Sequence, residues 1–315
     1  MCDPLTLTLS LRERESEPRV AGSDRRSTLL GQSRMTRHHP FTVALAAGLA
    51  VATLLVGTSR AAEPAEDAGA KSQEELAKQT QNPVANLISV PFQNNFNFGA
   101  GPEHEMIWIM NVQPVIPIPL NEDWNLITRT ILPIINQPGL VAGQDDTFGM
   151  GDLNPTVFLS PAKDKGFIWG VGPSTTLPTA SASAIGSGQW SLGPAAVGLY
   201  MEGPWVVGAL VNQQWSMVGW GKRDVNGLLV QPFVNYNLSD GWYLTSAPII
   251  TGNFAGGSGG NHWTVPVGGG VGKLSRLGKI GLPLNIQLVP FYNAVTPDFG
   301  PDWQLRFQLQ FLFPK

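Results

Sequence analysis

The sequence has almost no cysteine and little charge. Cys2 is the only cysteine among 315 residues, which excludes a disulfide framework and a zinc site built on thiolates. Charged residues make up 14% of the chain and the formal net charge is -3. No Lys/Arg cluster occurs in the second half, so we expect no nucleic-acid partner. The 10 Trp residues and many short apolar runs exclude a disordered chain.

The chain also lacks an apolar run long enough for a transmembrane helix. The longest run, Phe41 to Val56, falls short of the ~20 residues that a spanning helix usually needs. A short basic segment after Met35 precedes the run, and the small residues Ser59 and Ala61 follow it, as in a cleaved signal peptide. A membrane anchor is the alternative. We expect a signal peptide over 35–62, and we interpret 1–34 as upstream sequence wrongly included in the coding region.

From residue 87 onward, apolar and polar residues alternate with a period of two. Such alternation is what a strand between lipid and a wet lumen requires. A soluble β-sandwich or barrel also alternates, but its solvent face would carry more charge than the Asn, Gln, Ser and Gly found here. The pattern therefore predicts an all-β fold over 87–315, an up-and-down antiparallel transmembrane β-barrel. The clearest alternation joins apolar Trp303, Leu305, Phe307, Leu309, Phe311 and Phe313 with polar Gln304, Arg306, Gln308 and Gln310.

Twelve segments alternate in this way, and each is long enough for a tilted transmembrane strand, which needs ~9–11 residues. An even number is usual for bacterial outer-membrane barrels. Most Trp residues lie near segment ends, as in interfacial aromatic girdles. If the chain ends in the periplasm, short turns lie on that side and longer loops on the other. The predicted strands are 87–98, 105–118, 124–136, 148–160, 166–177, 189–201, 204–217, 225–238, 241–253, 262–274, 281–294 and 302–313.

The segment between the signal peptide and the barrel, 63–86, is acidic and rich in Ala and Gln. Ser72 followed by Glu75 has the spacing of a capping box, which predicts a short helix from there to about Gln79. Two interpretations stay open. The segment is a solvated periplasmic leader, or it is a small plug helix that enters the barrel.

Six segments in a fixed order carry a family resemblance: Trp124–Arg129, Gly149–Leu153, Gly193–Ala196, Gln231–Asn237, Trp263–Gly270 and Phe311–Lys315. They resemble the outer-membrane transporter family of the phenol-degradation meta-pathway, and the resemblance covers 82–315. It implies a barrel porin or transporter, encoded in some members beside pathways for aromatic compounds. It implies no binding residues.

Arg129 and Arg306 are the only arginines inside predicted strands, and Asp152 also lies in one. An arginine on a lipid face is costly, so we expect these charges in the lumen. The last strand must pair with the first, which places Arg306 near Asn95, and Asp152 offsets part of the charge of Arg129 if the two lie side by side. The group is either a structural network filling a narrow lumen or a constriction that selects solutes. The other candidates on this face are Gln231 and Gln308.

The sequence thus predicts a porin-like channel or transporter for small solutes, including hydrophobic or aromatic ones, in the outer membrane of a Gram-negative bacterium. Expected partners are outer-membrane lipid, the permeating solute and the barrel-assembly machinery, which would bind the C-terminal strand. We expect no enzyme, cofactor or metal site, because His104 and His262 lack ligand spacing and no nucleophile elbow exists. Two alternatives stay open: a structural or adhesive barrel with a closed lumen, and a lipid-acting enzyme that uses His262 with Ser258.

Overall fold

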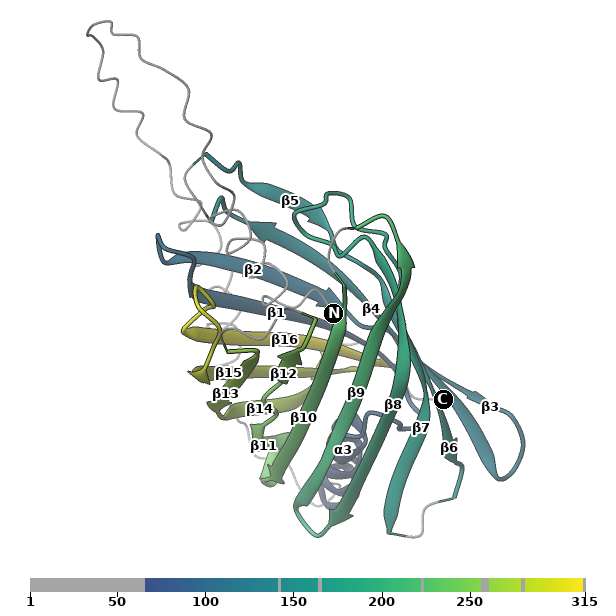
Figure 1. Ribbon diagram of the computed structural model, residues 1–315. Helices are drawn as coiled ribbons and strands as arrows, with labels where there is room; N and C mark the ends of the chain where they lie inside the picture. Colours follow the sequence, from purple (N-terminus) through teal and green to yellow (C-terminus); the bar gives the residue numbers. More distant parts are fainter. Residues whose placement is uncertain are drawn as a thin grey trace, which may run out of the picture. The chain divides into compact units, whose positions relative to one another are not determined.

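The computed structural model describes residues 66–140, 143–163, 166–221, 224–255, 261–278 and 281–313 (Figure 1). The expected upstream extension, 1–34, and the expected signal peptide, 35–62, lie outside these residues. Within them, no helix combines the length and apolarity that crossing a membrane would demand. Residues from Gly69 to the C-terminus belong to one compact unit.

The strands form one antiparallel sheet that closes on itself. The last strand pairs with the first from Ile88 opposite Phe313 to Phe98 opposite Trp303. Four crossings of the barrel are each split into two strands, namely β2 with β3, β5 with β6, β11 with β12 and β13 with β14. The sixteen strands therefore make twelve crossings, which confirms the predicted twelve-stranded barrel. The elements are α3 (Glu66–Thr80), β1 (Ile88–Ala100), β2 (Glu105–Val112), β3 (Val115–Pro119), β4 (Trp124–Gln137), β5 (Thr147–Met150), β6 (Asn154–Pro161), β7 (Phe167–Thr176), β8 (Gln189–Glu202), β9 (Trp205–Gly219), β10 (Asn226–Asn237), a 3-10 turn (Ser239–Gly241), β11 (Trp242–Ser246), β12 (Ile250–Asn253), β13 (Trp263–Gly268), β14 (Gly270–Leu277), β15 (Leu282–Val295) and β16 (Trp303–Phe313).

The crossings begin and end close to the predicted positions. The largest difference is at β14, which continues to Leu277 where the sequence predicted an end at 274. This extension corrects one expectation, because Arg276 also lies in a strand. Its side chain is exposed at the end of β14, so it contributes no charge to the interior.

Polar side chains are buried in this barrel and large apolar ones are exposed. On β16, Arg306 and Gln310 are buried, whereas Trp303 and Phe313 are exposed. The same holds around the sheet, where the buried set is rich in Asn, Gln, Ser and Thr. A soluble protein buries its large apolar residues and rarely exposes a continuous apolar band. The outer face therefore suits hydrocarbon, and the inner face suits water.

The four split crossings have local causes in the sequence. Pro114 lies between β2 and β3, and Pro248 lies between β11 and β12. Proline has no N–H to donate to a neighbouring strand, so the ladder stops there. Gly269 separates β13 from β14, and Asp152 lies in the gap between β5 and β6. The breaks leave backbone groups available to lumen side chains.

One glycine in the wall is required by a buried aromatic ring. Gly272 on β14 pairs with Tyr243 on β11, and a Cβ atom at Gly272 would overlap the tyrosine ring. The Tyr243 hydroxyl donates to Oδ1 of Asn285 at 2.7 Å and accepts from Nε2 of Gln287 at 2.7 Å. This side of the lumen is therefore filled by packed and hydrogen-bonded side chains.

The segment before β1 contacts the lumen face of the barrel. Ala77 and Leu87 pack in one cluster with Leu274 and Leu312, which face inward. Gln81 and Asn237 exchange two hydrogen bonds, of 2.8 and 3.3 Å. Figure 1 shows α3 within the ring of strands. Of the two interpretations of this segment, these contacts favour the plug.

The helix itself differs from the prediction at its start. It ends at Thr80, next to the predicted end at Gln79, but it begins at Glu66. Ser72 is therefore inside the helix, and its assignment as the capping residue is wrong.

Candidate functional site

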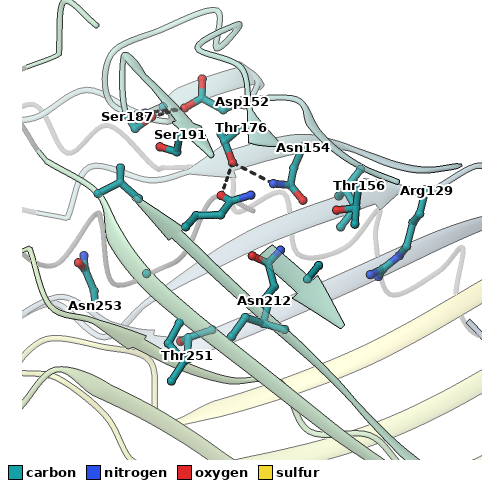
Figure 2. A pocket seen from close by; sticks show the side chains of 18 of the residues that line it. Arg129, Asp152, Asn154, Thr156, Thr176, Ser187, Ser191, Asn212, Thr251 and Asn253 are labelled. Carbon is teal, nitrogen blue, oxygen red and sulfur yellow. Dashed lines mark hydrogen bonds between the residues drawn. The ribbon is translucent and has the colours of Figure 1, made fainter. Parts of the chain in front are cut away.

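The lumen holds two cavities. The first has a volume of about 110 Å³ and is lined at one end by loop residues 184–187 (Figure 2); we name it the loop-side cavity. The second has a volume of about 150 Å³ and is lined by residues 79–83, at the end of α3 and just after it; we name it the helix-side cavity. Arg129 and Leu210 line both. The two cavities therefore meet at this pair of side chains.

Arg129 projects from β4 at this junction. The strand alternation directs it inward, since its neighbours on the same face, Ile127 and Ile131, are buried. Its Nη2 donates a hydrogen bond to Oε1 of Gln113 at 2.8 Å. Gln113 lies in the break between β2 and β3. No ion pair joins Arg129 to a carboxylate in the described part of the chain.

Arg306 is held much more tightly. It is 3% exposed and lines the helix-side cavity. Its Nε donates to Oδ1 of Asn95 at 3.2 Å, its Nη1 to the Ala247 carbonyl at 2.8 Å, and its Nη2 to Oε1 of Gln304 at 3.3 Å. The guanidinium also lies over the Phe291 ring, 4.8 Å from its centroid. The predicted proximity of Arg306 and Asn95 is confirmed.

The two arginines give the lumen fixed positive charge. A guanidinium stays protonated in proteins, so neither side chain can become neutral. Their hydrogen-bond acceptors among the described residues are amide and carbonyl oxygens, which are uncharged. A buried charge without a counter-charge is costly. Water or an anion in the lumen would lower that cost.

Asp152 has a different role from the one expected beside Arg129. The β4–β6 register places Arg129 opposite Thr156, four residues from Asp152, or about 13 Å along the strand. The carboxylate, 2% exposed, instead accepts from the Ala180 N–H at 3.0 Å, the Ser187 N–H at 2.7 Å and the Ser187 hydroxyl at 2.8 Å. Asp152 therefore fixes the loop between β7 and β8.

That loop folds back onto the barrel interior. Ile185 is buried in a cluster with Ile107, Ile135 and Leu140. Ser181 adds a hydrogen bond from its N–H to the Met150 carbonyl, at 2.9 Å. The loop thus covers one end of the loop-side cavity. Little in the sequence indicates this, because the segment is mostly Ala, Ser and Gly and has only two large apolar residues, Leu177 and Ile185.

The remaining predicted residues lie around the helix-side cavity. Asn95 is buried and links Arg306 to the backbone, since its Nδ2 donates to the Ile109 carbonyl at 3.4 Å. Gln231 and Gln308 both line this cavity, and Gln308 lies 3.5 Å from Oε1 of Gln310. The structure brings Arg306, Asn95 and Gln308 together, and it places Asp152 at the loop-side cavity.

A polar wall of the loop-side cavity was missed in the sequence. The Ser174 hydroxyl contacts Thr156, Asn212 and Gln214, each at 2.8 Å. Ser191 is 1% exposed, lines the same cavity, and its hydroxyl has no hydrogen-bond partner among the described residues. Strand alternation could have assigned these residues to the lumen. Their meeting depends on the stagger of β6 to β9, which no single segment specifies.

The barrel wall is thin beside this cavity. Pro173 on β7 pairs with Pro194 on β8, and the β6–β7 ladder has only two paired positions. An apolar groove lies over these strands on the outer face, lined by Pro173, Pro194, Ala195 and Val211 among others. Ala195 also lines the loop-side cavity. One small side chain therefore separates the cavity from the lipid-facing surface here.

The described residues contain no group of three or more His, Cys, Asp or Glu side chains that could hold a metal ion. His104 lies 4.0 Å from Asp302 on the exposed rim of the barrel. His262 stacks at 6.4 Å from Phe254, and its proposed partner Ser258 lies outside the described residues. The hydrolytic pair therefore remains a hypothesis without geometric support.

Comparison with known proteins supports the fold. No protein-family model matches the chain, and no curated protein matches it. Among solved structures, an outer membrane channel from Pseudomonas putida F1 superposes with a TM-score of 0.54 at 18% sequence identity. The match covers 72% of this chain and 94% of that one. At this identity the likeness shows the fold alone: the chain folds as an outer-membrane channel of known structure does.

Proposed function

We propose that the chain forms a channel in the outer membrane of a Gram-negative bacterium and admits small solutes, hydrophobic or aromatic ones among them. Its apolar outer face would contact lipid, and its C-terminal strand, ending near Phe313, would be bound by the barrel-assembly machinery. The family of the phenol-degradation meta-pathway is part of this proposal, on the six resembling segments. The solved barrel with a similar fold is itself an outer membrane channel.

One observation carries the proposal. Two cavities meet inside the barrel at Arg129 and Leu210, and neither Arg129 nor Arg306, which line them, forms an ion pair with a carboxylate in the described part of the lumen. A barrel that only needed to be filled would be more stable with apolar or neutral side chains at these positions. Charged groups facing an accessible lumen are the usual means of selecting solutes.

The predicted selectivity residues are proposed to act at two places in the lumen, the junction of the two cavities and the helix-side cavity. Arg129 would select at the junction of the cavities. Arg306, Gln231 and Gln308 would line the helix-side cavity. Asn95 would hold Arg306 in position there, and Asp152 would hold the covering loop in place. The apolar part of the loop-side cavity, with Phe158 and Leu210, and the thin wall at Ala195 support solutes with apolar bodies.

Recordings from purified full-length protein in planar lipid bilayers test the channel directly. We expect discrete conductance steps and, because Arg129 lies where the two cavities meet, a reversal potential that indicates preference for anions. Uptake of small aromatic solutes into protein-containing vesicles is the second measurement. A protein that folds and inserts but shows neither conductance nor uptake would retire the channel.

A structural barrel with a closed lumen is the second candidate, and specific contacts favour it. Gln81 binds Asn237 inside one mouth, and the loop carrying Ile185 covers the other end. If these closures are permanent, the bilayer recordings should show no conductance at any voltage or salt concentration. In that case Arg306 and its three acceptors serve only to fill the interior.

A further inference from the structure

The loop-side cavity has two unlike ends. Arg129 lies at one end, and Asp152 with Ser187 lies at the other, where Ser191 is also found (Figure 2). One end is therefore cationic. The other carries the carboxylate of Asp152, which accepts hydrogen bonds from Ala180 and Ser187 of the loop. A solute lying along the cavity would meet opposite charges at its two ends.

The middle of the cavity is largely apolar. Ile131, Phe158, Leu210 and Leu229 line it, and Phe158 is completely buried. The volume, about 110 Å³, is on the scale of the ~150 Å³ apolar cavities that accept benzene. The space therefore suits a compact apolar body about the size of one six-membered ring, and is too small for a long acyl chain.

At the cationic end, most N–H donors of the Arg129 guanidinium have no acceptor among the described residues. In the described part of the chain the only hydrogen bond from the Arg129 guanidinium goes from Nη2 to Gln113. A guanidinium presents five N–H donors in a planar fork that matches the two oxygens of a carboxylate. A carboxylate at this end would supply both the missing acceptors and the missing counter-charge.

The opposite end has a buried hydroxyl without a partner. Ser191 Oγ is inaccessible and unpaired among the described residues, and it lines the cavity. A buried polar group without a partner is destabilising, and such a group commonly marks a place where a ligand or water binds. A hydroxyl or other neutral polar group on the solute would pair with it.

We propose that the loop-side cavity binds a small monocarboxylate with a compact, ring-sized apolar body. Its carboxylate binds Arg129, its body packs on Phe158 and Leu210, and any polar group at its far end faces Ser191. A second carboxylate is disfavoured, because it would face Asp152. This inference rests on the proposed channel and names the class of solute that its lumen selects.

Calorimetric titration of the purified full-length protein with four probes tests the site. Benzoate has the acid and the ring, benzamide lacks the charge, acetate lacks the ring, and terephthalate has a second acid. We expect benzoate to bind about tenfold more tightly than benzamide, since one charge-assisted hydrogen-bonded contact has about that effect. Acetate should also bind more weakly because it buries no ring, and terephthalate because its second carboxylate would face Asp152. Equal affinity for benzoate and benzamide would overturn the proposal.

Variants locate the site. Arg129→Gln should weaken benzoate binding about tenfold or more and remove the preference over benzamide, while Arg129→Lys should keep that preference. Arg276→Gln, which removes an exposed arginine outside both cavities, is the matched control and should bind like wild type. Loss of binding in Arg306→Gln together with full binding in Arg129→Gln would refute this cavity as the site. Heat-modifiable migration on gels verifies that each variant is folded.

Failure of this inference and failure of the channel are distinguishable. A protein that conducts and takes up solutes, yet binds benzoate no better than benzamide, would leave the channel standing and refute the site. A protein that binds with the expected order but never conducts would keep the site and retire the channel.

Discussion

Arg129 and Arg306 are the same residue type on the same face of the barrel, but their surroundings differ. Arg306 donates three hydrogen bonds, to Asn95, Gln304 and the Ala247 carbonyl, and lies over Phe291. Arg129 makes one hydrogen bond in the described part of the chain and faces two cavities. The first guanidinium ties three crossings of the wall together. The second is left available to whatever occupies the lumen.

This difference separates structural from selective charge. A guanidinium whose donors are mostly used in hydrogen bonds, which we call saturated, contributes mainly to stability, because its removal takes the donor from several acceptors. An unsaturated one contributes mainly to the electrostatic potential of the lumen. Both arginines point inward because an arginine on the lipid face would be costly. They differ only in their hydrogen-bond partners.

The largest expected effect comes from moving an arginine to the other face. Leu309 lies three residues beyond Arg306 on β16 and faces outward. Leu309→Arg should lower the free energy of unfolding by ~2–4 kcal/mol if it lies near the bilayer midplane. Gln308→Arg, on the lumen side, is the matched control and should cost much less. Urea unfolding from lipid vesicles measures both, and equal losses would mean that the two faces are misassigned.

Removal of the saturated arginine should have the next largest effect. Arg306→Met keeps length and apolar contact with Phe291 but removes the donor from the Ala247 carbonyl and from Oε1 of Gln304, so we expect a loss of about 2 kcal/mol. The same unfolding titration measures it. If the variant is as stable as wild type, water replaces the guanidinium without penalty, and the structural role assigned to Arg306 is wrong.

A smaller loss should follow from removing one acceptor. Asn95→Ala deprives Arg306 Nε of its partner and should cost about 1 kcal/mol. Combining it with Arg306→Met gives a double-mutant cycle. The double variant should lose less stability than the sum of the two single losses, because the residues are in contact. Full additivity would show that the hydrogen bond between them contributes nothing.

The smallest stability effect is expected at Arg129. Arg129→Gln should change the free energy of unfolding by less than about 1 kcal/mol, since a single hydrogen bond, to Gln113, is lost and the cost of a charge without a counter-charge is removed with it. Its reversal potential in a salt gradient should nevertheless shift toward cation preference, while Arg276→Gln leaves it unchanged. A stability loss as large as that of Arg306→Met would erase the distinction between the two arginines.

Much of the fold could be predicted because its signal is local. A period of two is readable within each segment, so the twelve crossings and the inward face of Arg306 and Asn95 follow from the sequence. Pairing of the last strand with the first then follows from closure of the barrel. The candidate site was predicted less well, since the sequence left open whether Asp152 lies beside Arg129 and the polar wall around Ser174 and Ser191 was not foreseen.

The sequence by itself determined which side chains face inward, because neighbouring residues on a strand point to opposite faces and the bilayer accepts only one of them. Only the tertiary structure decided what each inward side chain meets. The stagger between strands set Thr156, and not Asp152, opposite Arg129. The break at Pro248 freed the Ala247 carbonyl for Arg306, which is far away in sequence. The fold-back of the loop at Ile185 closed the cavity over Asp152, because its contacts come from strands that the loop does not join.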